Sequence, residues 1–115
     1  SYTTSPAYHV EYEDTRRYQA AVFDEGHYMQ IEGVGIVKNA PHPKAAQQFI
    51  DFVLTEKFQE VIPLTNWMYP VLPEIELPES YEFAPQPDTR FYFDAKKIDA
   101  NRDEWIDVWS KAVTR

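Results

Sequence analysis

The sequence predicts an α/β fold, and three stretches of the chain carry this prediction. Residues 27–37 are rich in strand-forming side chains. Residues 44–54 place apolar side chains at the spacing of one helical face, and residues 105–113 do so again with two tryptophans one turn apart. Strand and helix signals that follow one another within 115 residues indicate an α/β unit of about one domain.

The N-terminal stretch predicts irregular structure followed by a short strand. Residues 1–9 combine hydroxyl and phenol side chains with Pro6, which disfavours a helical residue before it, so we expect a loop there. Residues 11–17 are mostly charged, as in a solvated connection or a short helix. Residues 18–23 predict a short strand that ends at the polar residues 24–26.

The main strand is predicted over residues 27–37, where Gly33 and Gly35 indicate a bend or the close approach of another backbone. Three side chains around its start suggest a metal or acid–base cluster: Glu25, His27 and Glu32. In a strand, however, the last of these points to the opposite face from the other two. We therefore expect a structural histidine rather than a metal ligand.

Two helices are predicted after the strand. A turn at residues 38–43 brings Pro43 to the first turn of a helix over residues 44–54. Thr55 is expected to cap a second helix, which Pro63 ends. The apolar side chains that this second helix should bury are Phe58, Val61 and Ile62.

Residues 71–87 are rich in proline and acidic side chains, which predicts an extended wrap over the surface. A brief strand is expected at residues 91–93. Asn101 and Glu104 resemble a capping box, and Asp99 is a second candidate cap for the last helix. The two tryptophans of that helix, Trp105 and Trp109, share its apolar face, and we expect both in the core.

Composition excludes several classes of partner and site. Eleven basic against nineteen acidic residues give a formal net charge of -8, which argues against nucleic acid and anionic membranes. No cysteine is present, so this chain has no disulfide, thiolate metal site or cysteine nucleophile. No apolar run approaches the length of a membrane span or a signal peptide. No cofactor is indicated.

Two aromatic and polar segments, residues 1–9 and 66–71, are the candidate binding elements. Rings for stacking and hydroxyls for hydrogen bonds suit a small planar ligand with a polar tail. Tyr8 and Trp67 are the candidate stacking residues. The candidate polar residues either hold the polar tail of the ligand or form a turn in which their side chains hydrogen-bond to the neighbouring backbone. They are Tyr2, Thr3, Thr4 and Ser5, with Asn66 and Tyr69 as secondary candidates.

These segments, together with residues 25–28 between them, closely resemble the C-terminal part of bacterial periplasmic thiamine-binding proteins, over essentially the whole chain. The resemblance implies the C-terminal portion of a type II periplasmic-binding fold, comprising one lobe plus the hinge crossing. It divides the chain into four parts: a ligand loop and hinge strands (1–37), helices and a second ligand loop (38–70), the wrap (71–98) and the C-terminal helix (99–115).

The resemblance also implies a function. By this resemblance, the larger protein to which the chain belongs would bind thiamine or thiamine phosphates in the periplasm and deliver them to the membrane permease of an ABC importer, without catalysis. The hydroxyl-rich segment would hold the polar end, and the tyrosine and tryptophan would stack on a ring. The first residue is not Met and the length suits one lobe, so we expect a piece of a larger protein whose N-terminal part completes the cleft. The isolated piece is expected to self-associate.

Two alternatives remain open at the level of sequence. A binding protein of the same fold could take ferric iron or a polyamine, since ferric sites use tyrosines and this chain has eight. Thiaminase-like enzymes share the two-lobed fold but use a cysteine nucleophile, which this chain lacks.

Overall fold

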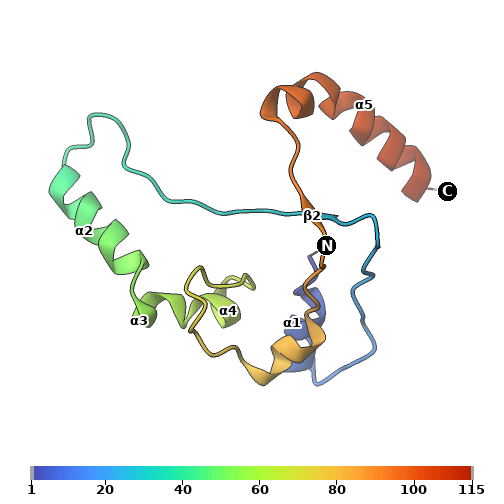
Figure 1. The fold of residues 1–115 in the computed structure, drawn as a ribbon, viewed down its shortest axis with the longest axis horizontal. Helices are drawn as coiled ribbons and strands as arrows, with labels where there is room; N and C mark the ends of the chain where they lie inside the picture. Colours follow the sequence, from blue (N-terminus) through green and yellow to red (C-terminus); the bar gives the residue numbers. More distant parts are fainter. Residues whose placement is uncertain (1, 115) are drawn as a thin grey trace.

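The computed structural model describes residues 2–114 as short helices and one small parallel sheet joined by long extended connections (Figure 1). Helices α1 and α2 lie on either side of the first strand in sequence, and the longest helix, α5, ends the chain. The elements are α1 (Ser5–Glu13), β1 (His27–Tyr28), α2 (Pro43–Val53), α3 (Glu56–Gln59), α4 (Ile62–Thr65), the 3₁₀ helix η1 (Glu79–Phe83), β2 (Arg90–Phe91) and α5 (Ala95–Val113).

The arrangement of these elements is open. The radius of gyration is 17.7 Å, whereas a compact domain of this length has about 13 Å. In Figure 1, α2 and α5 project to opposite sides, and the extended stretch between β1 and α2 crosses the molecule. Many large apolar side chains along these segments are exposed. Within the described residues, no helix is both long and apolar enough to cross a membrane.

Residues 5–9 are helical, so the prediction of a loop over the whole of residues 1–9 is wrong. Pro6 stands in the first turn of α1, where a proline costs no hydrogen bond because the N–H groups there have no partner inside the helix. Asp14 ends α1 in the left-handed conformation, at φ 48°. The backbone N–H of Thr15 then donates to the carbonyl of His9 at 3.2 Å, which closes the last turn.

The helix predicted at residues 44–54 is confirmed as α2, with Pro43 in its first turn. The second predicted helix is divided into α3 and α4. Pro63 does not end it: this proline lies in the first turn of α4 and is buried. Of the three side chains expected to be buried there, Val61 is exposed and the other two are half-buried.

The strands are much shorter than predicted. Residues 18–23 form no strand, and only the first two residues of the 27–37 stretch pair, with His27 opposite Arg90 and Tyr28 opposite Phe91 in a parallel register. A segment with high strand propensity forms a β-strand only where a neighbouring strand accepts its backbone hydrogen bonds. A side chain at Gly33 or at Gly35 would meet nothing within 4 Å, so no other backbone approaches either glycine in the described chain.

Gly26 is the glycine that the sheet requires. Its φ is +100°, and a Cβ there would lie 2.7 Å from the Cγ2 of Thr89 and 2.9 Å from the Thr89 carbonyl oxygen. The next residue, His27, donates its backbone N–H to that same carbonyl at 3.1 Å. The turn before β1 therefore packs directly on the residue before β2, which only a glycine permits.

The small core joins the first helix to the proline-rich wrap. Ala7 of α1 is buried against Tyr81 of η1 and the adjacent Ala84, with Trp67 and Tyr69 packed at the edge. The predicted wrap is thus not extended throughout, because η1 interrupts it, and the wrap contributes two of the three core residues, Tyr81 of η1 and Ala84 directly after it. In Figure 1, η1 lies directly beside α1.

Helix α5 starts earlier than predicted, and its cap is neither Asn101 nor Asp99. The Asp94 side chain accepts hydrogen bonds from the backbone N–H groups of Lys96 and Lys97 and so caps the helix. The prediction that Trp105 and Trp109 are core residues is wrong: they are 37% and 65% exposed. The apolar face is real: the Phe93 ring packs against Trp105 at 5.4 Å, while Trp109 is left largely exposed.

Candidate ligand-binding site

Tyr8 and Trp67, the two predicted stacking residues, lie in contact. Their ring centroids are 5.2 Å apart and their planes meet at 78°, an edge-to-face arrangement. Tyr8 stands on α1 and Trp67 on the loop after α4, so the fold brings together two segments that are distant in sequence. The Tyr8 ring is 40% exposed, which leaves part of it open to a ligand.

Tyr12 is a third member of this cluster that the sequence analysis missed. It follows Tyr8 by four residues, and the two rings are 5.3 Å apart on the same face of α1. The Tyr12 ring also meets the indole of Trp67, at 5.6 Å and 71°. Once α1 is recognised as a helix, the spacing of these tyrosines predicts that they share a face, but the expected loop concealed it.

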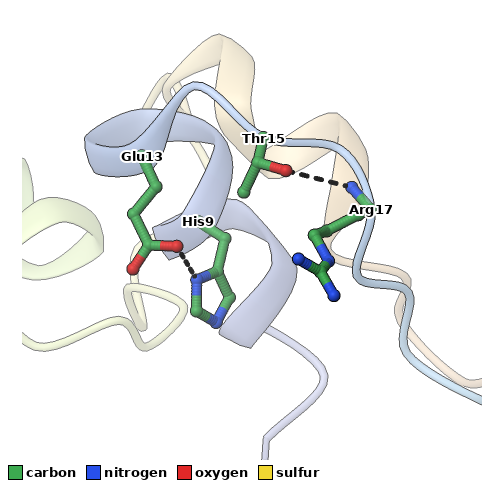
Figure 2. A network of polar contacts seen from close by, with 4 residues as sticks. All are labelled: His9, Glu13, Thr15 and Arg17. Carbon is green, nitrogen blue, oxygen red and sulfur yellow. Dashed lines mark hydrogen bonds and ion pairs between the residues drawn. The ribbon is translucent and has the colours of Figure 1, made fainter.

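The other end of α1 is fastened by polar contacts, which Figure 2 shows, and by ring contacts. His9 Nδ1 and Glu13 Oε2 lie 2.7 Å apart, one helical turn from each other. The His9 ring packs on Tyr18 at 4.2 Å, and the guanidinium of Arg17 lies 5.1 Å from the centre of the same tyrosine ring. These contacts hold residues 17–18 against the middle of α1.

Trp67 adopts a strained backbone conformation. Its φ is 55°, in the left-handed region that bulky residues rarely occupy and that costs about 1–3 kcal/mol. Tyr81 compensates on one side, because its ring stacks on the indole with only 9° between the planes. The Tyr81 hydroxyl lies 2.8 Å from the Pro63 carbonyl oxygen and 3.3 Å from that of Met68, both acceptors in the same loop region.

Four further hydrogen bonds hold the 66–71 loop and the Gln59 side chain that supports it. The side chain of Gln59, which is 2% exposed, accepts from the backbone N–H of Val71 and donates to the carbonyl of Val53, both at 2.8 Å. Tyr69 donates its hydroxyl proton to the Ala84 carbonyl at 2.5 Å. Asn66 Nδ2 donates to the Glu32 carboxylate at 2.9 Å. The amide and hydroxyl of two predicted site residues, Asn66 and Tyr69, are therefore engaged within the chain.

Burial raises the pKa of both tyrosines that hold this loop. The pKa of Tyr81 is raised to about 12, first by desolvation and then by the neighbouring Tyr69. Desolvation likewise raises the pKa of Tyr69, against smaller opposing effects of Gln86 and Arg90. Both hydroxyls thus keep their protons near neutral pH and remain donors to the loop carbonyls.

The four predicted polar contacts surround the start of α1. Thr4 stands at the helix cap, but its hydroxyl is buried and makes no hydrogen bond to the helix. The backbone N–H groups of Ser5 and Ala7 already donate to Tyr2 and Thr4 carbonyls, both at 3.1 Å, and Pro6 has none. Two of the backbone donors at the start of α1 are therefore engaged within the chain.

His27 has a structural role, as expected. Its Nε2 accepts a hydrogen bond from the backbone N–H of Phe23 at 2.9 Å, and the two rings stack at 5.4 Å. Glu32 is engaged instead with Asn66, so these side chains do not converge. Among residues 2–114, no group of three or more histidine or carboxylate side chains could hold a metal ion.

Comparison with known proteins gives consistent matches. A profile of the bacterial extracellular solute-binding proteins matches residues 5–60. The whole chain is 43% identical to the thiamine-binding periplasmic protein of Escherichia coli and covers 35% of it. A solved periplasmic thiamin binding protein, also 43% identical, superposes over the whole chain with a TM-score of 0.81, and 36% of that protein is covered.

A more distant relative is an iron uptake protein of Synechocystis. It is 38% identical over 55 residues, which are 48% of this chain and 15% of that protein. The predicted α/β fold, a portion of a periplasmic-binding fold, is confirmed by the solved relative. The chain spans about a third of the length of the thiamine-binding relatives that it matches.

Proposed function

We propose that the chain belongs to the bacterial extracellular solute-binding proteins and that it forms one wall of a thiamine-binding cleft in a periplasmic member of that family. This family consists of binding proteins, in agreement with the expectation that the chain is not part of an enzyme. The full-length protein would capture thiamine or a thiamine phosphate and present it to the membrane permease of an ABC importer.

The observation that carries the proposal is the contact between Tyr8 and Trp67. Stacking on a planar cationic ring requires aromatic faces that are partly open and held in place, and a cation–π contact contributes about 0.5–2 kcal/mol. Tyr8 offers an exposed ring, and Trp67 is held from behind by Tyr81. The formal net charge of -8 favours a cation such as the thiazolium of thiamine.

The polar end of the ligand would lie at the start of α1. We assign this role to Tyr2, Thr3, Thr4 and Ser5. The amides of Ser5 and Ala7 are already engaged and the Thr4 hydroxyl is buried, so the exposed side chain of Tyr2 is the most accessible of the four. No lysine or arginine occurs in residues 2–9, so a phosphate held there would be neutralised only by hydrogen bonds. Asn66 and Tyr69 would then shape the loop and touch the ligand only through their remaining atoms.

The domain organisation belongs to the same proposal. Residues 1–37 would supply a ligand loop and the hinge strands, residues 38–70 the second ligand loop, residues 71–98 the wrap, and residues 99–115 the terminal helix. The open shape and the exposed apolar side chains support a second part of the protein that packs against this one. Without it, the chain should self-associate and bind thiamine weakly, because cleft closure completes such sites.

Titration calorimetry of the full-length protein with thiamine, thiamine monophosphate, ferric ion and putrescine tests the proposal. We expect thiamine binding with a submicromolar Kd in the full-length protein and at least a hundredfold loss in the isolated residues 1–115. Equal affinity in both would contradict the two-lobed cleft. Binding of ferric ion or putrescine without thiamine would overturn the assignment of the ligand.

Ferric iron is the second candidate, supported by the match to the iron uptake protein. That match spans 55 residues and therefore cannot include both Tyr8 and Trp67, whereas the thiamine-binding relatives match over the whole chain. The part of the chain that carries both predicted stacking residues is thus shared as a whole with the thiamine-binding relatives but not with the iron uptake protein.

A further inference from the structure

We propose that Tyr81 is a positioning residue, which never touches the ligand but sets its affinity by holding Trp67 in its strained conformation. The proposal rests on the proposed function for its ligand, and on the packing around Trp67 for its mechanism. Tyr81 lies on η1 and is 5% exposed, so its ring and hydroxyl face the interior rather than a cleft.

The first step of the argument is the backbone of Trp67. A tryptophan at φ 55° relaxes to a lower-energy conformation unless its surroundings prevent it. Relaxation would rotate the indole away from Tyr8 and Tyr12, to which it now presents edge-to-face contacts at 5.2 and 5.6 Å. The ligand-facing geometry of the cluster therefore depends on whatever holds this residue.

Tyr81 contacts both the side chain and the flanking backbone of that residue. Its ring lies nearly parallel to the indole, with centroids 6.3 Å apart, and so supports the indole along one side. Its single hydroxyl proton is shared between the carbonyls of Pro63, before Trp67, and Met68, directly after it. One side chain thus fixes the loop on both sides of the strained residue.

Tyr81 is itself fixed firmly enough to do this. The Tyr69 ring packs edge-on against it at 5.3 Å, and Ala7 of α1 and Ala84 complete its surroundings. Ala7 directly precedes Tyr8 on α1. Tyr81 therefore contacts both the indole of Trp67 and the helix that carries Tyr8. Tyr81 therefore sets the distance between the two stacking residues.

The test compares Tyr81→Phe with Tyr92→Phe in the full-length protein. Both variants remove one phenolic hydroxyl, but Tyr92 is exposed and its hydroxyl contacts only Met29 Sδ, far from the cluster in sequence. We expect the thiamine Kd to rise about tenfold in Tyr81→Phe and to stay within twofold in Tyr92→Phe. A change of less than twofold in Tyr81→Phe, in protein that is folded by circular dichroism, would overturn the proposal.

A double-mutant cycle shows whether Tyr81 acts through Trp67. In a Trp67→Ala background, Tyr81→Phe should change the thiamine Kd by less than twofold, because the residue that it positions is gone. Independent, additive losses would mean that Tyr81 affects binding by another route and would overturn the proposal.

A measurement without ligand separates this inference from the proposed function. The indole N–H resonance of Trp67, assigned by its loss in Trp67→Phe, should shift and broaden in Tyr81→Phe and remain in place in Tyr92→Phe. An unchanged resonance in Tyr81→Phe refutes the positioning role even if thiamine binds. Conversely, a protein that binds no thiamine refutes the proposed ligand, while the resonance still decides the role of Tyr81.

Discussion

Asn66 donates a hydrogen bond from its side-chain amide to the Glu32 carboxylate at 2.9 Å, and so ties the Trp67 loop to the extended stretch after β1. Glu32→Ala removes the acceptor and should weaken thiamine binding about two- to fivefold, or about 0.5–1 kcal/mol. Glu32→Gln keeps an acceptor oxygen and should retain most of the affinity. Calorimetric titration measures both, with the exposed Glu25→Ala as the control. Equal affinities in all three variants would show that the tether has no part in binding.

Trp67→Ala should reduce thiamine affinity by about 1–3 kcal/mol, because a stacking partner for the cationic ring is lost. Trp109→Ala is the matched control, since Trp109 lies on α5 and is far more exposed. The thiamine affinity of Trp109→Ala should stay within twofold of that of the unmodified full-length protein. The prediction fails if both tryptophan variants bind equally well while Trp67→Ala remains folded.

Gln59→Met should lower the free energy of unfolding by about 1–3 kcal/mol. The change leaves the buried Val71 N–H and Val53 carbonyl without their partner while keeping the side-chain volume. Gln47→Met provides the comparison, because that amide forms only an exposed contact with Asp51 one turn along α2. Urea denaturation of the full-length protein should show a shift of the midpoint for the first variant and almost none for the second.

Asp94→Ala should destabilise α5 by about 1 kcal/mol through loss of its cap. Asp99→Ala removes a carboxylate of the same kind from inside the helix, where alanine has the higher helix propensity, so no loss is expected. Hydrogen exchange of the first-turn amides, Lys96 and Lys97 above all, reports the difference directly. Faster exchange in Asp99→Ala than in Asp94→Ala would contradict the assignment of the cap.

Stability should fall steeply in the alkaline range because of Tyr81. Its folded pKa of about 12 exceeds the unfolded value near 10, so the unfolded chain releases this proton first as the pH rises. The stabilisation that the raised pKa of Tyr81 gives to the folded state is fully present below about pH 10 and is lost as the pH approaches 12. Denaturation midpoints across this range should decline more gently in Tyr81→Phe than in the parent. Parallel curves would rule out this source of the pH dependence.

The sequence predicted the helices that carry a continuous apolar stripe. The helix at residues 44–54 was found within one residue at each end, and the C-terminal helix was found apart from its start. Local propensity is sufficient where hydrogen bonds close within one segment. It failed at α1, where Pro6 suggested a loop although a proline fits the first turn of a helix as well as it fits a turn.

Strands and burial were predicted less well, because both depend on neighbours that are distant in sequence. The 27–37 stretch has strand-forming residues, but pairing extends only as far as β2 reaches. The apolar faces of Trp105 and Trp109 were identified correctly, yet a stripe does not reveal whether anything covers it. In the candidate site, the aromatic and polar segments suggested Tyr8 and Trp67. Tyr81 was expected only as an anchor of the proline-rich stretch, and its support of Trp67 was not predicted.

The parallel pairing of His27 with Arg90 has a consequence for the time course of folding. The stretch between the two strands contains α2, α3, α4 and η1. The strands can therefore pair only after the two ends of this long stretch have come together. Closing so long a loop costs entropy before any strand hydrogen bond is gained, and such contacts form slowly. The short helices should therefore appear early. The contact between Tyr8 and Trp67, which closes a loop that contains β1, α2, α3 and α4, should be among the last to form. A slow kinetic phase in refolding, seen by the fluorescence of Trp67 but not by helical circular dichroism, would be its signature.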